Sequence, residues 1–522
     1  MPGGIPYIIS NEAAERFSFY GMRTILVIFM TQYLWLMDGP GGEKMSQTQA
    51  TAYYHDFVSW VYFTPLLGAL LSDIFLGKYR TIIILSVVYC IGHAALAFMG
   101  TVGSSGWWLF GGLALITLGA GGIKPCVSAH VGDQFGKGNS HLLTKIFNWF
   151  YFSINLGSFV STLMTPWLLK WYGPHWAFGI PGVLMALATL LFWMGRNKFI
   201  HVPAGGKKFV QETFSREGLV ALGKLIPLYL FIAMFWALFD QTGSSWVFQA
   251  QDMDRNFLGI QWLESQIQAI NPLLILTFIP VFTIFVYPAI DKVFYLTPLR
   301  KIGIGLFLAA ASFGVATLAQ GWIDGGERPS VAWQILAYAL LTASEVMVSI
   351  VALEFSYTQA PKTMKSMIMA VFLVSVWMGN VFTAGINKAI IIPEASEQEL
   401  AAGFDGQKES GDEITPPDKE DKYALHSFKT EGLDEQVADI LASLSATVKA
   451  TERLPTTNSV DLPQDPWGNS FRYRQLNSLT GRLSSDGPDE KSGTKWDLNF
   501  TLTLDEEKPE ESSSWTDIFH PE

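Results

Sequence analysis

Long apolar segments dominate the first 392 residues of this 522-residue chain. A helix needs about 20 mostly apolar residues to cross the roughly 30 Å hydrocarbon core of a bilayer. Eleven segments of this kind are present, near residues 7–37, 51–76, 81–103, 107–130, 143–165, 175–198, 222–249, 271–296, 301–320, 331–359 and 365–392. We therefore predict an all-α polytopic membrane protein whose helices are surrounded by lipid.

The apolar segments form two sets, which are separated by a basic loop. Six helices, a charged linker and a second set of helices is the layout of a transporter built from two halves around a site near the membrane midplane. We predict an N-terminal half at 1–198, a cytoplasmic linker at 199–221 and a C-terminal half at 222–392, as in a bundle of two six-helix halves. The second half is one helix short, because nothing after Ile392 is apolar for long enough to span. Either the bundle is incomplete or the sequence is a shortened one, and we favour the second interpretation.

The tail beyond Ile392 is polar and holds 28 Asp and Glu against 12 Lys and Arg. The segment 393–431 has too few large apolar residues to build a core, so we predict an acidic disordered linker. Residues 432–522 combine one stretch of helical spacing with turn signals and short alternating segments, which indicates a small α+β domain. The formal net charge of -11 belongs to this tail, and no nucleic-acid partner is indicated.

The positions of Lys and Arg indicate an orientation, because short cytoplasmic loops carry the positive excess. The cation-rich loops alternate with loops that are short of cations, and the sequences of the former include LGKYR, DKVFYLTPLRK and APKTMKS. This pattern predicts a cytoplasmic N-terminus. With eleven spans, it also predicts that the C-terminal domain lies outside, in the periplasm if the protein sits in a bacterial inner membrane.

Charged side chains inside the first spanning segment are the sharpest functional signal. Glu12, Glu15, Arg16, Tyr20 and Arg23 recur at spacings that place them on one face of a helix. Acids near a helix N-terminus gain about 0.3–1 kcal/mol from the helix dipole, which is a structural explanation for the two glutamates. It does not explain the two arginines, and intramembrane ionisable groups are functional by default.

Several motifs resemble those of one known family. NEAAERFSFYGMR resembles the ExxERFxYY signature of the proton-dependent oligopeptide transporter (POT) family of the major facilitator superfamily. Further segments agree in order along residues 5–392, namely YYHDFVSWVYFTPLLGALLSD, GGIKPCVSAHVGDQF, FNWFYFSINLGSFVS, FWALFDQTGSSW and EVMVSIVALEFSYTQAPKTMKS. Phe19 departs from the signature where a Tyr is frequent, which places one hydroxyl contact in doubt.

The resemblance implies roles in proton coupling. Glu12 and Glu15 would be titrating carboxylates with Arg16 as their switchable partner, because a carboxylate that gains or loses an Arg changes its proton affinity. Asp240 matches a family position tied to proton movement and to salt bridges between the halves. His55 matches a histidine that is important in some members, although a lone His near a helix end is more often structural.

The resemblance also implies a substrate site. Lys124, with Arg16 and Arg23, would meet the substrate carboxylate, or Lys124 would pair with the ExxER cluster. Glu345 has no cation one helical turn away, so the α-ammonium of a peptide would neutralise it. Glu354 is either a gate ion pair or a solvated helix end. Asn155 would bond the peptide backbone through its amide. The side-chain pockets would be lined by the aromatic residues Tyr20, Tyr62, Trp236 and Trp377. Aromatic residues in membrane helices more often only pack or anchor the helix at the membrane interface.

The tail carries a second resemblance, because LPTTNSVDLPQDPWGNSFRYR and SSDGPDEKSGTKWD look like the globular domain of major pseudopilins of type II secretion. Asp486, Asp489 and Asp497 fall where that family often binds calcium, and oxygen-rich loops suit this cation. A merely solvated acidic loop explains them equally well. No pilin-type helix precedes the domain, so polymerisation is not implied, and the resemblance favours a bacterial source.

These observations predict a symporter of di- and tripeptides that is driven by the proton gradient and needs no cofactor. Two alternatives stay open: a peptide-binding receptor or sensor on a transporter scaffold, and a transporter of another small solute such as nitrate. Glu345 opposes the last, because an acidic group near the midplane repels anions. No nucleotide loop, nucleophile triad or zinc spacing indicates an enzyme.

Overall fold

The computed structural model describes most of the predicted membrane part and a smaller portion of the tail. The described residues are 1–37, 45–136, 138–206, 211, 215–324, 328–359, 365–390, 440, 462–465, 467–475, 480–486 and 498–503. The chain divides into two compact units, Met1–Ala389 and Ile390–Glu522. Each unit is described by itself.

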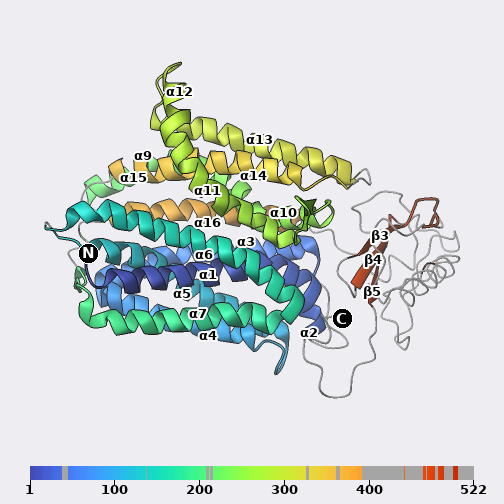
Figure 1. The fold of residues 1–522 in the computed structure, drawn as a ribbon, viewed down its shortest axis with the longest axis horizontal. Coiled ribbons are helices and arrows are strands. Elements are labelled where there is room, and N and C mark those ends of the chain that lie inside the picture. Colours follow the sequence, from blue (N-terminus) through green and yellow to red (C-terminus); the bar gives the residue numbers. More distant parts are fainter. Residues whose placement is uncertain are drawn as a thin grey trace. The chain divides into compact units, whose positions relative to one another are not determined.

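The N-terminal part of the first unit is helical in all six predicted segments. Long helices alternate in direction and lie roughly along one axis (Figure 1). They are α1 Ile5–Ile28 with η1 Phe29–Tyr33 and α2 Leu34–Met37, α3 Gln47–Leu70 with η2 Leu71–Leu76, α4 Lys78–Ala97, α5 Ser105–Asp133, η3 Ser140–Leu142 with α6 Leu143–Tyr172, and α7 Pro174–Met194 with η4 Gly195–Lys198. Helix α4 ends at Ala97, six residues before the predicted end, because Gly100 and Gly103 turn the chain with positive φ.

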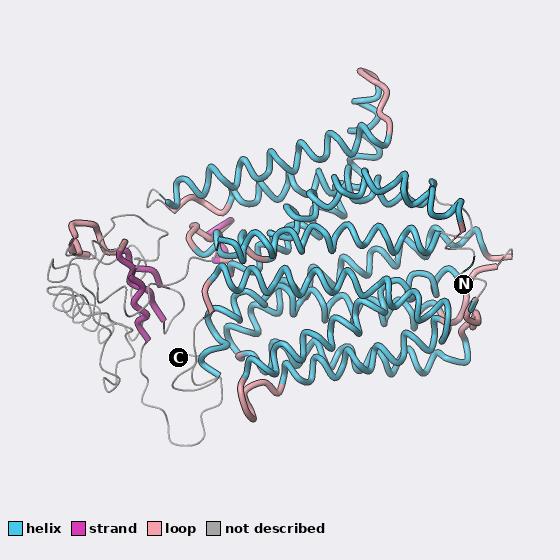
Figure 2. Tube along the Cα trace, turned by 180° about the vertical axis from the view of Figure 1, so that it is seen from behind, coloured by secondary structure: helices cyan, strands magenta, loops and turns pink. Residues whose placement is uncertain are grey.

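The C-terminal part is helical in the five remaining predicted segments. Its elements are α9 Arg216–Phe239, η5 Asp240–Gly243, α10 Ser245–Gln251, the hairpin β1 Asn256–Phe257 and β2 Ile260–Gln261, η6 Glu264–Ala269, α11 Ile270–Val281, η7 Phe282–Val286, α12 Tyr287–Asp291, α13 Pro298–Asp324, α14 Ala332–Glu345, η8 Val346–Ile350, α15 Val351–Gln359 and α16 Lys365–Ile390. Helix α9 begins inside the predicted linker, because a spanning helix continues beyond its apolar stretch. The tube in Figure 2 shows the same helical unit from behind.

Length and hydropathy identify membrane spans within the described residues. Nine helical segments there are long and apolar enough to cross a bilayer. Helices α1 and α6 complete the predicted set; α1 contains the four charged residues Glu12, Glu15, Arg16 and Arg23, which lower its mean hydropathy. The first unit is therefore the predicted multi-pass helical bundle.

Glycines let the helices that carry the site approach one another closely. A Cβ on Gly157 of α6 would lie 2.7 Å from the backbone oxygen of Ala13 and 3.4 Å from Cβ of Arg16. Gly68 of α3 and Gly122 of α5 pack backbone to backbone, so that neither position has room for a side chain. The charged face of α1 is thus held against α6, and α3 against α5.

The two ends of the first unit are distinguished by which loops they contain. Met1 and the segment after α7 lie at one end, because Lys198 Nζ donates to the Tyr7 hydroxyl at 2.9 Å. The loop between α4 and α5 and the hairpin after α10 lie at the other end, which we call the distal end.

The described part of the tail is a three-stranded antiparallel sheet in the order β3 Arg472–Gln475, β4 Thr480–Ser485, β5 Leu498–Thr503. Leu483 pairs with Tyr473 on one side and Phe500 on the other. Asp465 is buried and accepts a 2.6 Å hydrogen bond from Ser485 Oγ. The predicted linker 393–431 and nearly all of the predicted tail helix lie outside the described residues, so the α+β assignment remains a prediction.

Candidate functional site

The charged face of α1 forms a compact cluster at its first turns. Arg16 Nε donates to Glu12 Oε1 at 2.7 Å and lies 3.3 Å from Glu15 Oε2. Both carboxylates are buried, with Glu12 1% and Glu15 0% exposed. Two acids therefore share one guanidinium: Glu12 lies one helical turn before Arg16, and Glu15 directly precedes Arg16 in the sequence. Neither oxygen of Glu15 has a hydrogen bond in the structure.

Lys124 extends this cluster from α5. Its ammonium is buried without a hydrogen-bond partner and lies 3.6 Å above the centre of the Phe19 ring and 5.0 Å from that of Tyr62. Its strongest charge interaction is with Glu15. The Lys124 ammonium is held only by aromatic rings and by a carboxylate that forms no hydrogen bond. It can therefore bind an anionic group without breaking a hydrogen bond of its own. Phe19, the departure from the family signature, provides one of the two rings.

A second buried cluster joins the two halves. Arg23 on α1 forms an ion pair of 2.5 Å with Asp240, and its Nε donates to the Tyr54 hydroxyl at 2.6 Å. Asp240 begins η5, where the polar sequence DQTG interrupts the helix between α9 and α10. Gly243 lies against the Tyr54 hydroxyl, where no side chain would fit. The interruption of the helix thus places a carboxylate opposite the arginine.

His55 belongs to the same cluster and is fully buried. Its Nδ1 lies 2.7 Å from Asn380 Oδ1, and its Nε2 lies 2.9 Å from Ser244 Oγ. Asn380 Nδ2 donates in turn to Asp240 Oδ2 at 2.6 Å. Sequence reasoning named His55 and Asp240 but missed Asn380 and Ser244. A lone amide within the apolar run VWMGNVF was the available signal for Asn380.

Other contacts between the halves lie nearer the distal end. Gln266 and Gln268 of η6 donate to the backbone oxygens of Leu163 and Thr24, at 2.8 and 3.2 Å. Lys388 and Asp56 form a more exposed ion pair at 2.5 Å. Together with the Arg23–Asp240 cluster, these contacts join the two halves on the distal side of the bundle.

Glu345 lies near mid-length of the path from α14 to α15 in the C-terminal half. Asn271 Nδ2 of α11 donates to Glu345 Oε2 at 2.7 Å and to Thr342 Oγ1 at 3.1 Å. Within the described residues no ion pair forms on this carboxylate. Two tyrosines of the N-terminal half, Tyr20 and Tyr151, lie within electrostatic range of this carboxylate. An acid that is held by an amide thus faces the N-terminal half.

The remaining predicted residues are distributed around these groups. Tyr20 lies within electrostatic range of Arg16 and Arg23 of the N-terminal half and of Glu345 of the C-terminal half. Tyr62 interacts with Tyr20, Arg23 and Arg16. The last four predicted residues do not contact the charged clusters in the described contacts. Asn155 Nδ2 donates to the backbone oxygen of Tyr151 at 2.9 Å, and Glu354 is exposed. Trp236 packs on Phe235 and Phe239, and Trp377 packs on Phe63.

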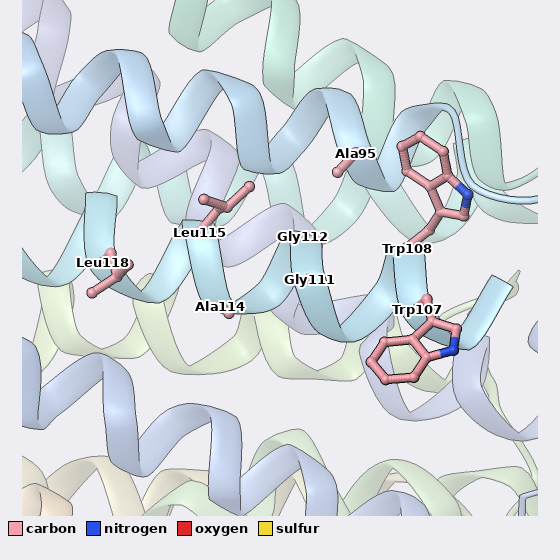
Figure 3. Close-up of a pocket in the computed structure, with 8 residues that line it drawn as sticks. All are labelled: Ala95, Trp107, Trp108, Gly111, Gly112, Ala114, Leu115 and Leu118. Carbon is pink, nitrogen blue, oxygen red and sulfur yellow. The ribbon is translucent and has the colours of Figure 1, made fainter. Parts of the chain in front are cut away.

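An apolar hollow of about 430 Å³ lies between α4 and α5, and none of the predicted site residues lines it (Figure 3). Its lining contains no charged side chain and consists of Ala95, Trp107, Trp108, Gly111, Gly112, Ala114, Leu115 and Leu118. A zwitterion would find no partner there. The groups suited to a charged solute are those at which the two halves face each other.

The calcium candidates of the tail receive no support from the described residues. Asp486 forms an ion pair with Arg472, and Asp489 and Asp497 lie outside the described residues. No group of three or more His, Cys, Asp or Glu side chains that could hold a metal ion occurs in the part of the chain that the structure describes.

A bundle of two helical halves with buried ionisable groups at their interface is the architecture of the major facilitator type. The model of the POT family matches residues 79–217 and 215–398, which is more than half of the chain. The chain therefore belongs to the POT family, as the motifs predicted.

Individual relatives agree with this assignment. The chain is 40% identical over 362 residues to Peptide transporter family 1 of Drosophila melanogaster, which covers 60% of this chain and 47% of the relative. It is 36% identical over 391 residues to Solute carrier family 15 member 2 of Mus musculus, and the match covers 66% of this chain and 52% of that relative. The chain thus spans about half the length of these curated relatives.

Solved structures show the same fold. The POT family transporter PepTSo is 37% identical with a TM-score of 0.67, and the match covers 75% of this chain and 91% of that one. A proton dependent oligopeptide (POT) family transporter is 38% identical with a TM-score of 0.64, covering 76% and 94%.

Proposed function

We propose that this chain is a proton-coupled symporter that imports di- and tripeptides by alternating access. The observation that carries the proposal is the placement of opposite charges on the two halves. An unbonded ammonium, Lys124, belongs to the N-terminal half, and a carboxylate that is paired only with an amide, Glu345, belongs to the C-terminal half. A free peptide is a zwitterion, and its two ends would neutralise both groups.

Arg16 and Arg23 have different roles in this proposal. Arg16 is shared between Glu12 and Glu15 and lies close to the carboxylate end of the proposed site. Arg23 is committed to Asp240 in this conformation, so it would become available to substrate only after the distal contacts open. Tyr20 and Tyr62 lie near Arg16 and Arg23 and would contact the peptide itself, with Asn155, Trp236 and Trp377 further along the lining.

Proton coupling would use the cluster of Glu12, Glu15 and Arg16. One guanidinium cannot satisfy two buried carboxylates equally, so protonation of one acid releases Arg16 to the other acid or to the substrate. That exchange biases the halves toward one of two arrangements. Moving one charge through 100 mV supplies about 2.3 kcal/mol, and a unit pH gradient supplies about 1.4 kcal/mol more. Asp240 and His55 would act later in the cycle, at the distal contacts.

The proposed orientation follows the cation-rich loops. The N-terminus and the linker after α7 would be cytoplasmic, the distal end would face outward, and the tail unit would be extracytoplasmic. The distal contacts would then make this conformation closed to the outside. We further propose the inner membrane of a bacterium as the location, on the pseudopilin-like sequence of the tail.

Uptake of a labelled dipeptide into proteoliposomes, with and without an inward proton gradient, tests the proposal. A symporter concentrates the peptide only with the gradient. A receptor or sensor binds peptide without accumulating it, and a nitrate-type carrier accumulates the anion and not the peptide. Chains of this family are transporters, and no enzymatic activity is proposed.

A further inference from the structure

His55 is bonded through both ring nitrogens to the opposite half of the bundle. It belongs to α3, whereas Asn380 belongs to α16 and Ser244 precedes the first residue of α10. One imidazole therefore links three helices across the interface that opens and closes in alternating access. Asn380 also bonds Asp240, the partner of Arg23.

The hydrogen bonds of Asn380 determine which ring nitrogen of His55 carries the proton. Asn380 Nδ2 has two hydrogens and two acceptors, Asp240 Oδ2 at 2.6 Å and the Val376 backbone oxygen at 3.0 Å. The amide nitrogen must face these acceptors, so Oδ1 faces the ring and can only accept. His55 Nδ1 is therefore the donor in their 2.7 Å contact. In the neutral ring Nε2 then has a free lone pair.

Ser244 can serve Nε2 in either protonation state. Its Oγ lies 2.9 Å from Nε2 and 3.5 Å from the backbone oxygen of Gln241. Toward a neutral ring the hydroxyl donates to Nε2. Toward a protonated ring it accepts from Nε2–H and turns its own hydrogen to Gln241. Rotation of one hydroxyl thus keeps every hydrogen bond of the ring in both states.

The titratable and charged groups around His55 come from several elements. Tyr54 and Asp56 flank it on α3, Arg23 faces it from α1, and Asp240 faces it from η5. Lys388 of α16 pairs with Asp56. Helix α10 has no charged residue, and α5 carries its charged residues toward the opposite end of the bundle. A proton on His55 would thus enter a set of groups that is already paired.

We propose that Asn380 and Ser244 are positioning residues that let His55 gain and lose a proton while the distal side stays closed. Asn380 holds the ring in the Nδ1–H tautomer and connects it to Asp240, and Ser244 adapts to the state of Nε2. This role rests on the proposed function, but its geometry is testable without transport.

The tautomer is measured by nitrogen NMR of the full chain in lipid vesicles with ring-labelled histidine. The resonance that disappears in His55→Gln is that of His55. We expect the neutral ring to be protonated at Nδ1, and the Nε2–H form would overturn the proposal. Asn380→Leu should populate the other tautomer.

Titration of the same resonance tests Ser244. Ser244→Ala removes a charge-assisted hydrogen bond from the protonated His55 ring but only an ordinary one from the neutral ring. The titration midpoint of His55 should therefore fall by about 0.5–1 pH unit. Ser244→Thr should restore it, because the hydroxyl returns. Ser245→Ala, the matched control, bonds Gln241 and not His55 and should leave it unchanged. An unshifted midpoint in Ser244→Ala would contradict the proposal.

Transport then shows whether the hydrogen bonds of His55 to Asn380 and Ser244 are used in the transport cycle. The pH profile of dipeptide uptake should shift with Ser244→Ala by the same amount and should not shift when His55→Gln is already present. A shift that persists without His55 would make Ser244 merely structural. A wild-type chain without uptake would contradict the proposed function, while the NMR measurements would still decide the roles of Asn380 and Ser244.

Discussion

Replacement of Glu345 by glutamine isolates the charge that we assign to the amino end of the substrate. Glu345→Gln keeps the size of the side chain and keeps an oxygen that can accept the 2.7 Å hydrogen bond from Asn271. The neighbouring Thr342 contact of Asn271 is not touched. The variant therefore removes one negative charge and little packing, and its effect on binding measures the interaction with a cation.

The magnitude follows from the surroundings of the carboxylate. No cation pairs with Glu345 among the described residues, so the ammonium of the peptide would be its first ionic partner. A hydrogen bond to a charged group contributes about 1.5–3 kcal/mol, and loss of one buried partner costs about 2–5 kcal/mol. We expect a loss of about 2–3 kcal/mol, which is roughly 30- to 150-fold in the dissociation constant.

The assay compares two ligands that differ at the amino end. A dipeptide with a free amine should lose this affinity in Glu345→Gln, whereas its N-acetylated form, which has no cation, should change by less than about threefold. Glu354→Gln is the matched control, because Glu354 lies on α15 but is exposed. Equal losses for both ligands would remove Glu345 from the amine site.

Three further predictions concern other parts of the chain. Glu12→Gln and Glu15→Gln should abolish accumulation of peptide driven by the proton gradient but preserve peptide-for-peptide exchange, as measured by counterflow in proteoliposomes; continued accumulation would move coupling elsewhere. Asp240→Asn should leave Arg23 without its ion-pair partner inside the bundle, which costs about 3–5 kcal/mol of the closed conformation, so spin-label distances across the distal end should lengthen; an unchanged distance would show that the other distal contacts suffice. Deletion after Ile392 should preserve the affinity for dipeptides in any variant that remains folded by thermal shift, and loss of binding in such a variant would show that the tail contributes to the site.

The sequence by itself determined the helical bundle and one of its charged clusters. Apolar runs of about 20 residues have few stable forms in lipid other than helices, because every backbone group must be satisfied within the segment. The spacing of four residues between Glu12 and Arg16 along α1 decided their contact, because side chains three or four residues apart lie on one helical face. Both inferences depend only on local geometry.

Only the tertiary structure decided which distant side chains meet. Arg23 and Asp240 are 217 residues apart in the chain, and His55 and Asn380 are 325 apart. The partner of Glu345 is Asn271, on another helix. No periodicity reaches across such separations, because the meeting of two faces depends on the rotation, tilt and glycine contacts of whole helices. The sequence therefore showed which buried charges needed partners, and the packing of the two halves selected them.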